Sequence, residues 1–401
     1  MRFLAGAMIA VGIIYSLFPA VFAGDLYAYV SYGRLYGLYH VNPYHLTHPL
    51  GVQNDGILSQ CFHFYGNPPP SDNYGPLWTL LAGYVGGLEA HVDLFFQLWT
   101  YRLLGLMGAI ASAAGLWRIL ADAEPARRVK SVSAFAFHPL VLYEAAAGGH
   151  NDILMVAPVI WAFAIAESSP LLAGLLMGAS VAIKYVSLIV VPFLLIRIAR
   201  CSGVGTAMAA AVLTAAVPAI SFLPFWIGPE TLHPLANQLN DYRTSPMWLI
   251  VIALFALGRG DAMVTDHISW IRLFQSLVGL IGLAVVASSI FRYYRSGKPA
   301  EIFRAIAATV WSSASIYPWY LLWLSPALAA QGRWSRYAFW FCALVFLRYI
   351  QDITRQPNTT AAFNLMLVVL AVITAVFLFA PLFVFRRRVD SPASPAAVID
   401  R

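Results

Sequence analysis

The chain has 401 residues, of which 60% are hydrophobic and 11% are charged, and its mean hydropathy is +0.71. A soluble domain of this size does not carry so much apolar sequence, so the composition excludes the soluble enzymes and predicts transmembrane helices. Lys and Arg number 25 against 18 Asp and Glu, but no basic run is interleaved with aromatic residues on a polar stretch. Nucleic acid is therefore not an expected partner. Three scattered cysteines predict neither a disulfide framework nor a metal site.

The basic residues orient the predicted helices, because Lys and Arg gather in cytoplasmic loops. Five basic clusters are placed inside: 118–130, 197–200, 292–298, 333–336 and 386–388. The result is an all-α polytopic integral membrane protein with about twelve transmembrane helices and both termini in the cytoplasm. The predicted spans are 3–23, 94–120, 131–147, 151–167, 170–184, 186–200, 203–226, 269–291, 302–316, 319–331, 335–350 and 361–385. The first is interpreted as a retained helix rather than a cleaved signal peptide.

Two apolar segments do not fit as spans, because counting them would place a basic cluster outside. Residues 74–88, within a first external loop of residues 24–93, and residues 246–258 are therefore predicted to lie at the outer surface. Residues 1–385 form a single transmembrane domain in this interpretation, and the polar residues 386–401 are a disordered cytoplasmic tail.

The stretch "AGDLYAYVSYGRLYGLYHVNPYHL" follows the first span and places a carboxylate, Asp25, among tyrosines. Asp25 is either a general base that accepts the proton of a hydroxyl, or positions that hydroxyl, or is a helix-end carboxylate paired with Arg34. Tyr29 and Tyr32 follow Asp25 at helical spacing and share a face with it. They fit an interfacial aromatic belt or, as the second choice, a platform that binds sugar.

The stretch "AAAGGHNDILM" places His150, Asn151 and Asp152 directly after two glycines, at a predicted outer turn. Glycine allows the sharp turn, and three polar side chains then gather in it. Asp152 is either part of a site or the cap of the next helix. A divalent metal held by Asp25, His150 and Asp152 is the less favoured alternative to a site without cofactors, because the spacing matches no compact ligand motif.

Several basic residues lie at the predicted outer level and outnumber the external carboxylates. A phosphate is their natural partner, although any single one could instead extend to the membrane interface. As a set they predict that a phosphorylated lipid enters from the bilayer; the set comprises Lys184, Arg102, Arg243, Arg272, Arg348 and Arg355. Neither a nucleotide-binding loop nor a metalloprotease or serine-hydrolase motif occurs, and no internal repeat favours a transporter.

Five segments occur in an order that is typical of one family: "GDLYAYVSYGRLYGLYHVNPY", "NYGPL", "HPLVLYEAAAGGHNDILM", "LLAGLLMGASVAIKYVSLIVVPFLL" and "YPWYLLWLSPALA". Together they resemble the polyprenyl-phosphate-sugar-dependent glycosyltransferases of the GT-C class, and most closely the bacterial polyprenyl-phosphomannose-dependent α-mannosyltransferases. The resemblance covers about residues 1–350. The chain departs from the pattern at "NYGPL", which has one proline where two are common, and at His138, where an asparagine is common.

The resemblance implies a GT-C fold in the bacterial plasma membrane, with the active site on the external face. It implies that a sugar, mannose by analogy, is transferred with inversion from a polyprenyl-phosphate donor to a glycan or glycolipid acceptor. Asp25 takes the position of the catalytic base, Asp152 is the second acidic residue, and Lys184, Arg102, Arg243 and Arg355 are candidates for the donor phosphate. The expected substrate-binding residues are Tyr29, Tyr32, Arg34, Asn42, Tyr44, Tyr74, His150, Asn151, Tyr317 and Tyr320.

Two hypotheses that assign the chain to another class of protein stay open at this point. A transporter of lipid-linked sugar phosphates would use the same basic cavity without bond chemistry, and a non-catalytic homologue would only bind the lipid. The transporter hypothesis predicts polar residues in both halves of the membrane. The sequence places them mostly in the outer half, which favours the enzyme.

Overall fold

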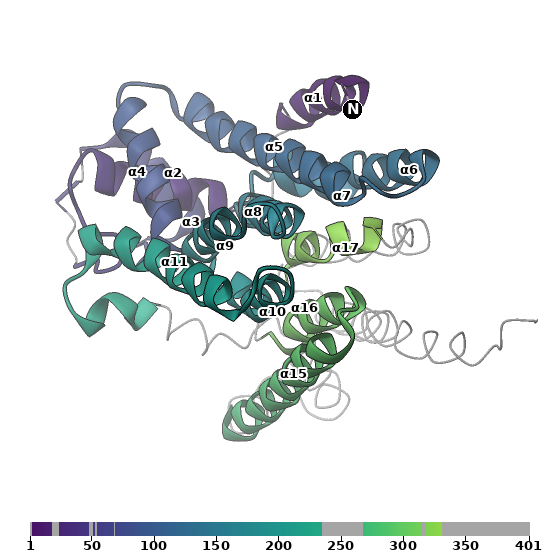
Figure 1. The fold of residues 1–401 in the computed structure, drawn as a ribbon. Helices are drawn as coiled ribbons and strands as arrows, with labels where there is room; N and C mark the ends of the chain where they lie inside the picture. The colour runs from purple at the N-terminus through teal and green to yellow at the C-terminus, as the bar shows by residue number, and fades with distance from the viewer. Residues whose placement is uncertain are drawn as a thin grey trace, which may run out of the picture.

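The computed structural model describes residues 2–17, 24–47, 51–52, 54–67, 69–234, 268–313 and 317–330. Within these ranges every regular element is a helix, which confirms the predicted all-helical fold (Figure 1). The first part comprises α1 (Arg2–Ser16), α2 (Gly24–Gly37), α3 (Gly56–Tyr65), α4 (Pro76–Leu88), α5 (Leu94–Ile119) and α6 (Pro125–Ala136). The next comprises α7 (Pro139–Leu142), the π-helix η1 (Tyr143–Ala147), α8 (Asp152–Ile165) and α9 (Pro170–Ile183).

The remaining helices are interrupted by short 3₁₀ segments. They are η2 (Tyr185–Val190), α10 (Val191–Ser202), α11 (Val204–Phe222), η3 (Leu223–Phe225), η4 (Pro229–Leu232), α15 (Ile268–Ser296), α16 (Ala300–Ser312), η5 (Pro318–Trp323) and α17 (Ser325–Ala330). In Figure 1, α15 and α16 lie side by side at the lower edge of the molecule, and they pack on α10 and η2.

Within the described residues, four helices are long and apolar enough to cross a membrane, by length and composition: Leu94–Ile119, Tyr185–Ser202, Val204–Phe225 and Gln275–Ser296. A fifth is counted if the bent pair Pro139–Ala147 and Asp152–Ile165 forms one span. Phe3–Ser16 and Pro170–Ile183 are apolar but shorter. The predicted integral membrane protein with several apolar helices is confirmed, and the count of about twelve spans stays a prediction.

The predicted span 131–147 is wrong as a continuous helix. The structure ends α6 at Ala136 and begins α7 at Pro139, because a proline has no N–H to continue the backbone ladder. The His138 side chain caps the new helix: its Nδ1 accepts a hydrogen bond from Leu140 N at 3.2 Å. An asparagine at this position would also cap a helix.

The predicted span 319–331 is also divided. Residues 318–323 form the 3₁₀ helix η5, and α17 begins at Ser325 with Pro326 in its first turn. Because of this division, the aromatic residues of η5 do not form a regular stripe along one α-helix. Instead, the η5 segment packs on α8 and η1.

Glycines set the closest helix contacts, as is usual where helices pack without large apolar side chains. In α2, a Cβ on Gly33 would lie 2.5 Å from the Ala82 carbonyl oxygen of α4. In α9, the GxxxG pair Gly174 and Gly178 lies against α11, where Thr214 Oγ1 donates to the Gly174 carbonyl at 2.9 Å. These contacts join α2 to α4 and α9 to α11, and α4 in turn contacts both α9 and α11.

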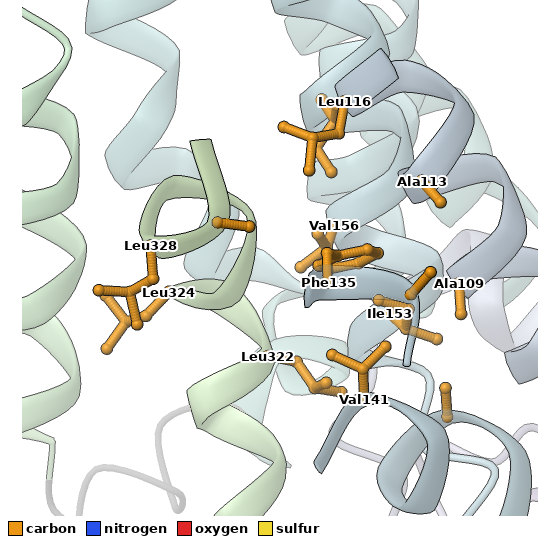
Figure 2. Packing of buried hydrophobic residues seen from close by; sticks show 14 of the residues in the cluster. Ala109, Ala113, Leu116, Phe135, Val141, Ile153, Val156, Leu322, Leu324 and Leu328 are labelled. Carbon is orange, nitrogen blue, oxygen red and sulfur yellow. The ribbon is translucent and has the colours of Figure 1, made fainter. Parts of the chain in front are cut away.

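One buried cluster joins α5, α6, α7, α8, η5 and α17, and it positions the site described below. Its members include Ala109 and Leu116 of α5, Phe135 of α6, Ile153 of α8 and Leu322 of η5 (Figure 2). Figure 2 shows these side chains converging from separate parts of the chain. Packing in this cluster brings residues 317–323 beside the turn at residues 148–152, more than 160 positions away in the sequence.

The helix 76–88 exists as predicted, and its position at a membrane surface stays a prediction. The predicted surface helix 246–258, the spans 335–350 and 361–385 and the tail 386–401 lie outside the described residues. Cys61 and Cys201 are free thiols, and Cys342 lies outside the described residues.

Candidate active site

A sharp turn at residues 148–151 joins η1 to α8, and the two helical segments meet at 117°. Gly149 has φ +62°, a conformation that only glycine adopts without strain, and a Cβ there would lie 2.6 Å from Leu26 Cδ2. A Cβ on Gly148 would lie 2.8 Å from His150 Cδ2. One glycine therefore allows the turn, and the other leaves room for the imidazole against the backbone.

Three ionisable side chains form a line beside this turn. His150 Nδ1 lies 3.4 Å from Asp25 Oδ2, and His150 Nε2 lies 3.4 Å from Glu144 Oε2. The His150 and Glu144 side chains are 1% and 0% exposed, whereas Asp25 keeps 21% of its side chain exposed. Asp25 is therefore the member of the line that a substrate can reach.

Asp25 lies in the first turn of α2, where the helix dipole stabilises a carboxylate. Burial raises the pKa of Asp25, but the hydrogen bond and charge of His150 and the charge of Lys184 outweigh burial. The pKa of Asp25 consequently lies below its ordinary value, and the group is a carboxylate at neutral pH.

Aromatic rings from η5 and the residue before it cover the imidazole. The Trp319 ring stacks on His150 with 3.9 Å between ring centroids, and the Tyr317 ring stacks on the other side of the indole at 4.6 Å. This stack covers the contacts of His150 with the two carboxylates, and it places Tyr317 beside Trp319, whereas a role of Tyr317 in binding substrate stays a prediction.

A second charged pair, formed by Asp152 and Lys184, lies at the start of α8. Lys184 Nζ donates to both carboxylate oxygens of Asp152, at 2.9 and 2.8 Å, and Trp323 Nε1 donates to Asp152 Oδ1 at 2.6 Å. The ammonium also lies 5.3 Å from the centre of the Tyr320 ring. Asp152 is the first residue of α8, but its carboxylate binds these side chains and not backbone N–H groups, so the prediction of a helix cap is wrong.

The "NYGPL" segment docks against the end of α9, next to Lys184. Gly75 N donates to the Ile183 carbonyl at 3.1 Å, and the Tyr74 carbonyl accepts the Tyr185 hydroxyl at 3.1 Å. Asp72 lies buried behind it and accepts from Tyr74 N at 2.8 Å and Thr79 Oγ1 at 2.7 Å. Burial raises the pKa of Asp72 to about 6, because these partners are neutral.

Several predicted site residues serve packing elsewhere. The Arg34 guanidinium binds Asp55 Oδ2 at 2.8 and 2.9 Å, so the predicted alternative of an Asp25–Arg34 pair is wrong. Arg102 Nη1 donates to the Ser16 carbonyl at 2.9 Å, beneath the end of α1.

Asn42 and Tyr44 fix the chain that leaves α2. Asn42 Nδ2 donates to the Phe225 carbonyl at 2.8 Å, and the Tyr44 hydroxyl donates to the Tyr74 carbonyl at 2.8 Å. Tyr29 and Tyr32 are buried in the aromatic core with Tyr74, rather than exposed as a belt or a sugar platform. Arg243, Arg348 and Arg355 lie outside the described residues, and Arg272 lies in α15.

Asn151 is a predicted site residue whose side-chain amide has no hydrogen-bond partner among the described residues. Its backbone N–H donates to the Tyr29 hydroxyl at 3.3 Å, which ties the turn to α2. Its side chain is buried, and within the described ranges neither amide atom has a hydrogen-bond partner. The same part of the chain holds no group of three or more His, Cys, Asp or Glu side chains arranged to hold a metal ion.

The sequence reasoning missed Glu144, Trp319 and Trp323. Glu144 was visible as one acidic residue in an otherwise apolar run, "LVLYEAAAGG", which is a signal of function in a membrane segment. The two tryptophans were in a motif already singled out, but their partners on residues 150 and 152 come from tertiary packing.

An apolar pocket begins beside the Asp152 pair. Met155, Val159 and Phe163 of α8 line it, and Trp323 lies at the end nearest the site. The pocket follows α8 for about 12 Å, from the rise of 1.5 Å per helical residue. Arg197 of α10 also lines it, with apolar residues of η2, α15, α16 and α17.

The comparisons with known proteins bear on this arrangement. No curated protein matches the chain. A solved structure of the archaeal oligosaccharyltransferase AglB from Archaeoglobus fulgidus, in complex with an inhibitory peptide and a dolichol-phosphate, matches with a TM-score of 0.44 and 13% identity. The match covers 94% of this chain and 55% of that one, so the chain spans about half the length of that protein.

A family model provides the clearer finding. It describes the N-terminal domain of alpha-(1->6)-mannopyranosyltransferases and matches residues 12–200. The matched range contains the Asp25–His150–Glu144 line and the Asp152–Lys184 pair. Over residues 12–200, the chain is therefore similar to the N-terminal domain of the alpha-(1->6)-mannopyranosyltransferase family.

Proposed function

We propose that the protein is a GT-C membrane glycosyltransferase that transfers mannose from a polyprenyl-phosphate donor to a glycoconjugate or lipid-linked acceptor. The observation that carries the proposal is the partly exposed carboxylate of Asp25, held by a buried histidine inside a region that matches a mannosyltransferase family. The reaction takes place at the external face, with both termini in the cytoplasm, as the basic clusters predict.

The chemistry follows from one carboxylate and a lipid phosphate as leaving group. The acceptor hydroxyl gives its proton to Asp25 as its oxygen bonds to the anomeric carbon of mannose. The bond from that carbon to the phosphate oxygen breaks on the opposite side, and its electron pair leaves with the polyprenyl phosphate. The configuration at the anomeric carbon is inverted, and Asp25 holds the proton at the end of the step.

Negative charge that develops on the phosphate needs a cation or donors aimed at it. Lys184 is the candidate among the described residues, because it lies 17% exposed beside the Tyr320 ring. Its ammonium has three N–H donors, and the two carboxylate oxygens of Asp152 occupy two of them. The third is left for a phosphate oxygen, with Arg243 and Arg355 as further candidates.

The apolar pocket along α8 has the chemistry and position for the polyprenyl chain of the donor. It begins at Trp323, which binds Asp152 directly, so a chain lying in it would present its phosphate end to Lys184. The unpaired amide of Asn151 is a donor and acceptor for a sugar or acceptor hydroxyl if the turn opens on binding.

The test compares wild type with Asp25→Asn in purified form, with radiolabelled short-chain polyprenyl-phosphomannose and a membrane-lipid extract as acceptor. We expect label in a new glycoconjugate with wild type, and at least a hundredfold less with Asp25→Asn, since general base catalysis contributes about 10²–10⁴. Asp122→Asn, an exposed aspartate near α6, is the matched control and should transfer normally.

Binding of the labelled donor separates the outcomes. Asp25→Asn should still bind the donor, because it retains the shape of the side chain. Transfer by Asp25→Asn at near the wild-type rate would refute Asp25 as the base. Tight binding by wild type with no product from any acceptor in the extract would instead favour a transporter or a binding protein.

A further inference from the structure

The described site contains a buried carboxylate that the proposed reaction does not use. Glu144 lies in the π-helix η1, its side chain is 0% exposed, and its Oε2 lies 3.4 Å from His150 Nε2. The other imidazole nitrogen faces Asp25 at the same distance. A histidine held between two carboxylates presents a donor to each only when it carries both protons.

The charged groups around the imidazole favour that protonated form. Asp25 of α2, Glu144 of η1 and Asp152 of α8 all contribute negative charge. Lys184 neutralises Asp152 at 2.8 Å, and Arg102 of α5 passes close to Gly149 while its guanidinium binds the Ser16 carbonyl. The negative charges of Asp25 and Glu144 therefore remain beside the imidazole, and a buried charge without a partner of opposite sign costs free energy.

We propose that Glu144 is a positioning residue that acts through His150: it keeps the imidazole positively charged and directed at Asp25, so that Asp25 stays ionised and aligned as a base. This inference rests on the proposed function of Asp25. With Glu144 ionised, the imidazolium contacts two carboxylates, the buried Glu144 and the more exposed Asp25. Without Glu144, Asp25 alone has to hold the charge on His150, and the imidazole becomes neutral at a lower pH.

The local backbone supports this role. Trp319 stacks on the face of the imidazole, so the two ring nitrogens at the ring edge are left to face the carboxylates. The backbone N–H of His150 donates to the Glu144 carbonyl at 3.0 Å, which ties the two residues together. Gly148 provides the space for the ring, since a Cβ there would lie 2.8 Å from it.

The experiment measures the pH dependence of kcat/KM for mannosyl transfer in full-length wild type, Glu144→Gln and His150→Gln. An opposite charge at this distance shifts a pKa by about one to three units. For Glu144→Gln we expect the alkaline limb of the profile, where the imidazole loses its proton, to move to lower pH by about one unit or more, with the rate recovering below it. The double variant should show no larger shift than His150→Gln, because Glu144 acts through the imidazole.

Two controls keep the inference separate from folding and from the proposed function. Glu167→Gln changes an exposed glutamate paired with Arg197 and should leave the profile unmoved. Gly148→Ala displaces the imidazole from the carboxylates without removing a charge and should move the alkaline limb in the same direction as Glu144→Gln. Donor binding by each variant shows that it is folded.

An alkaline limb that stays at the wild-type pH in folded Glu144→Gln or Gly148→Ala, whatever the rate, overturns the role of Glu144. If Asp25→Asn abolishes transfer in the same assay, the base assignment survives that failure. If Asp25→Asn transfers normally, the proposed function of Asp25 has failed first.

Discussion

The ion pair of Lys184 with Asp152 predicts that removing its two members has unequal effects on stability. Asp152 is 0% exposed and has one other described donor, Trp323 Nε1 at 2.6 Å, whereas the Lys184 side chain is 17% exposed. Lys184→Met therefore leaves a buried carboxylate with one neutral partner. Breaking a buried pair in this way costs about 3–5 kcal/mol of unfolding free energy.

Asp152→Asn leaves the less buried partner, and the amide oxygen can still accept the Trp323 hydrogen bond. Water can reach the ammonium, so we expect a loss of about 1–2 kcal/mol. The double variant Lys184→Met/Asp152→Asn carries no unpaired charge at all. We expect it to be more stable than Lys184→Met alone by about 1–2 kcal/mol, which is a coupling between neighbours and not a sum of separate losses.

The assay is reversible unfolding in mixed micelles followed by circular dichroism, with wild type and all three variants under one set of conditions. Lys298→Met, an exposed lysine after α15, is the matched control and should change stability by less than about 0.5 kcal/mol. A double variant as destabilised as the two single variants together would refute the reasoning. So would a Lys184→Met variant that unfolds like the control.

Two further predictions concern stability. Gly149→Ala should lose about 1–2 kcal/mol, because φ is +62° and a Cβ would meet Leu26 at 2.6 Å, whereas Gly205→Ala, with open space around its Cα, should not; equal stabilities in the micelle unfolding assay would contradict this. Asp72 has its folded pKa raised to about 6 from an unfolded value of about 3.9, so its effect is most favourable below pH 4 and is lost as pH rises to 6. The difference of about two pKa units between the folded and unfolded states corresponds to about 3 kcal/mol of unfolding free energy. Asp72→Asn should therefore remove the fall in stability between pH 4 and 6, and it should be more stable than wild type at pH 8. A wild type with constant stability over that range would count against it.

The local sequence pattern was sufficient to predict features that depend on a single helix or a single turn. The apolar runs predicted the helices at 94–119, 170–183 and 204–222 within a few residues, because a helix in lipid must satisfy its own backbone. Two adjacent glycines predicted the turn before His150, and Gly149 indeed has positive φ. The same pattern failed at 131–147, where the proline after His138 outweighed the continuous hydrophobicity.

The site was predicted in part, and the errors have a common cause. Asp25, His150, Asp152 and Lys184 were chosen as polar residues in an apolar chain, and the structure brings all four together. Arg34 and Arg102 were chosen by the same criterion, yet Arg34 pairs with Asp55 and Arg102 with a carbonyl. Rarity of charge in a membrane protein marks a residue that needs a partner, but it does not say whether the partner is protein or substrate.

The sequence by itself determined the class of the molecule, its helices and the candidates for chemistry, because hydrophobicity, backbone satisfaction and the cost of isolated charge are local properties. Only the tertiary structure decided which carboxylate faces which cation. The pairing of Asp152 with Lys184 and Trp323 joins three segments, and the contact of His150 with Asp25, Glu144 and Trp319 joins four. Such contacts depend on which helix faces meet in the packed core, and side-chain spacing along one helix carries no information about the face it will meet.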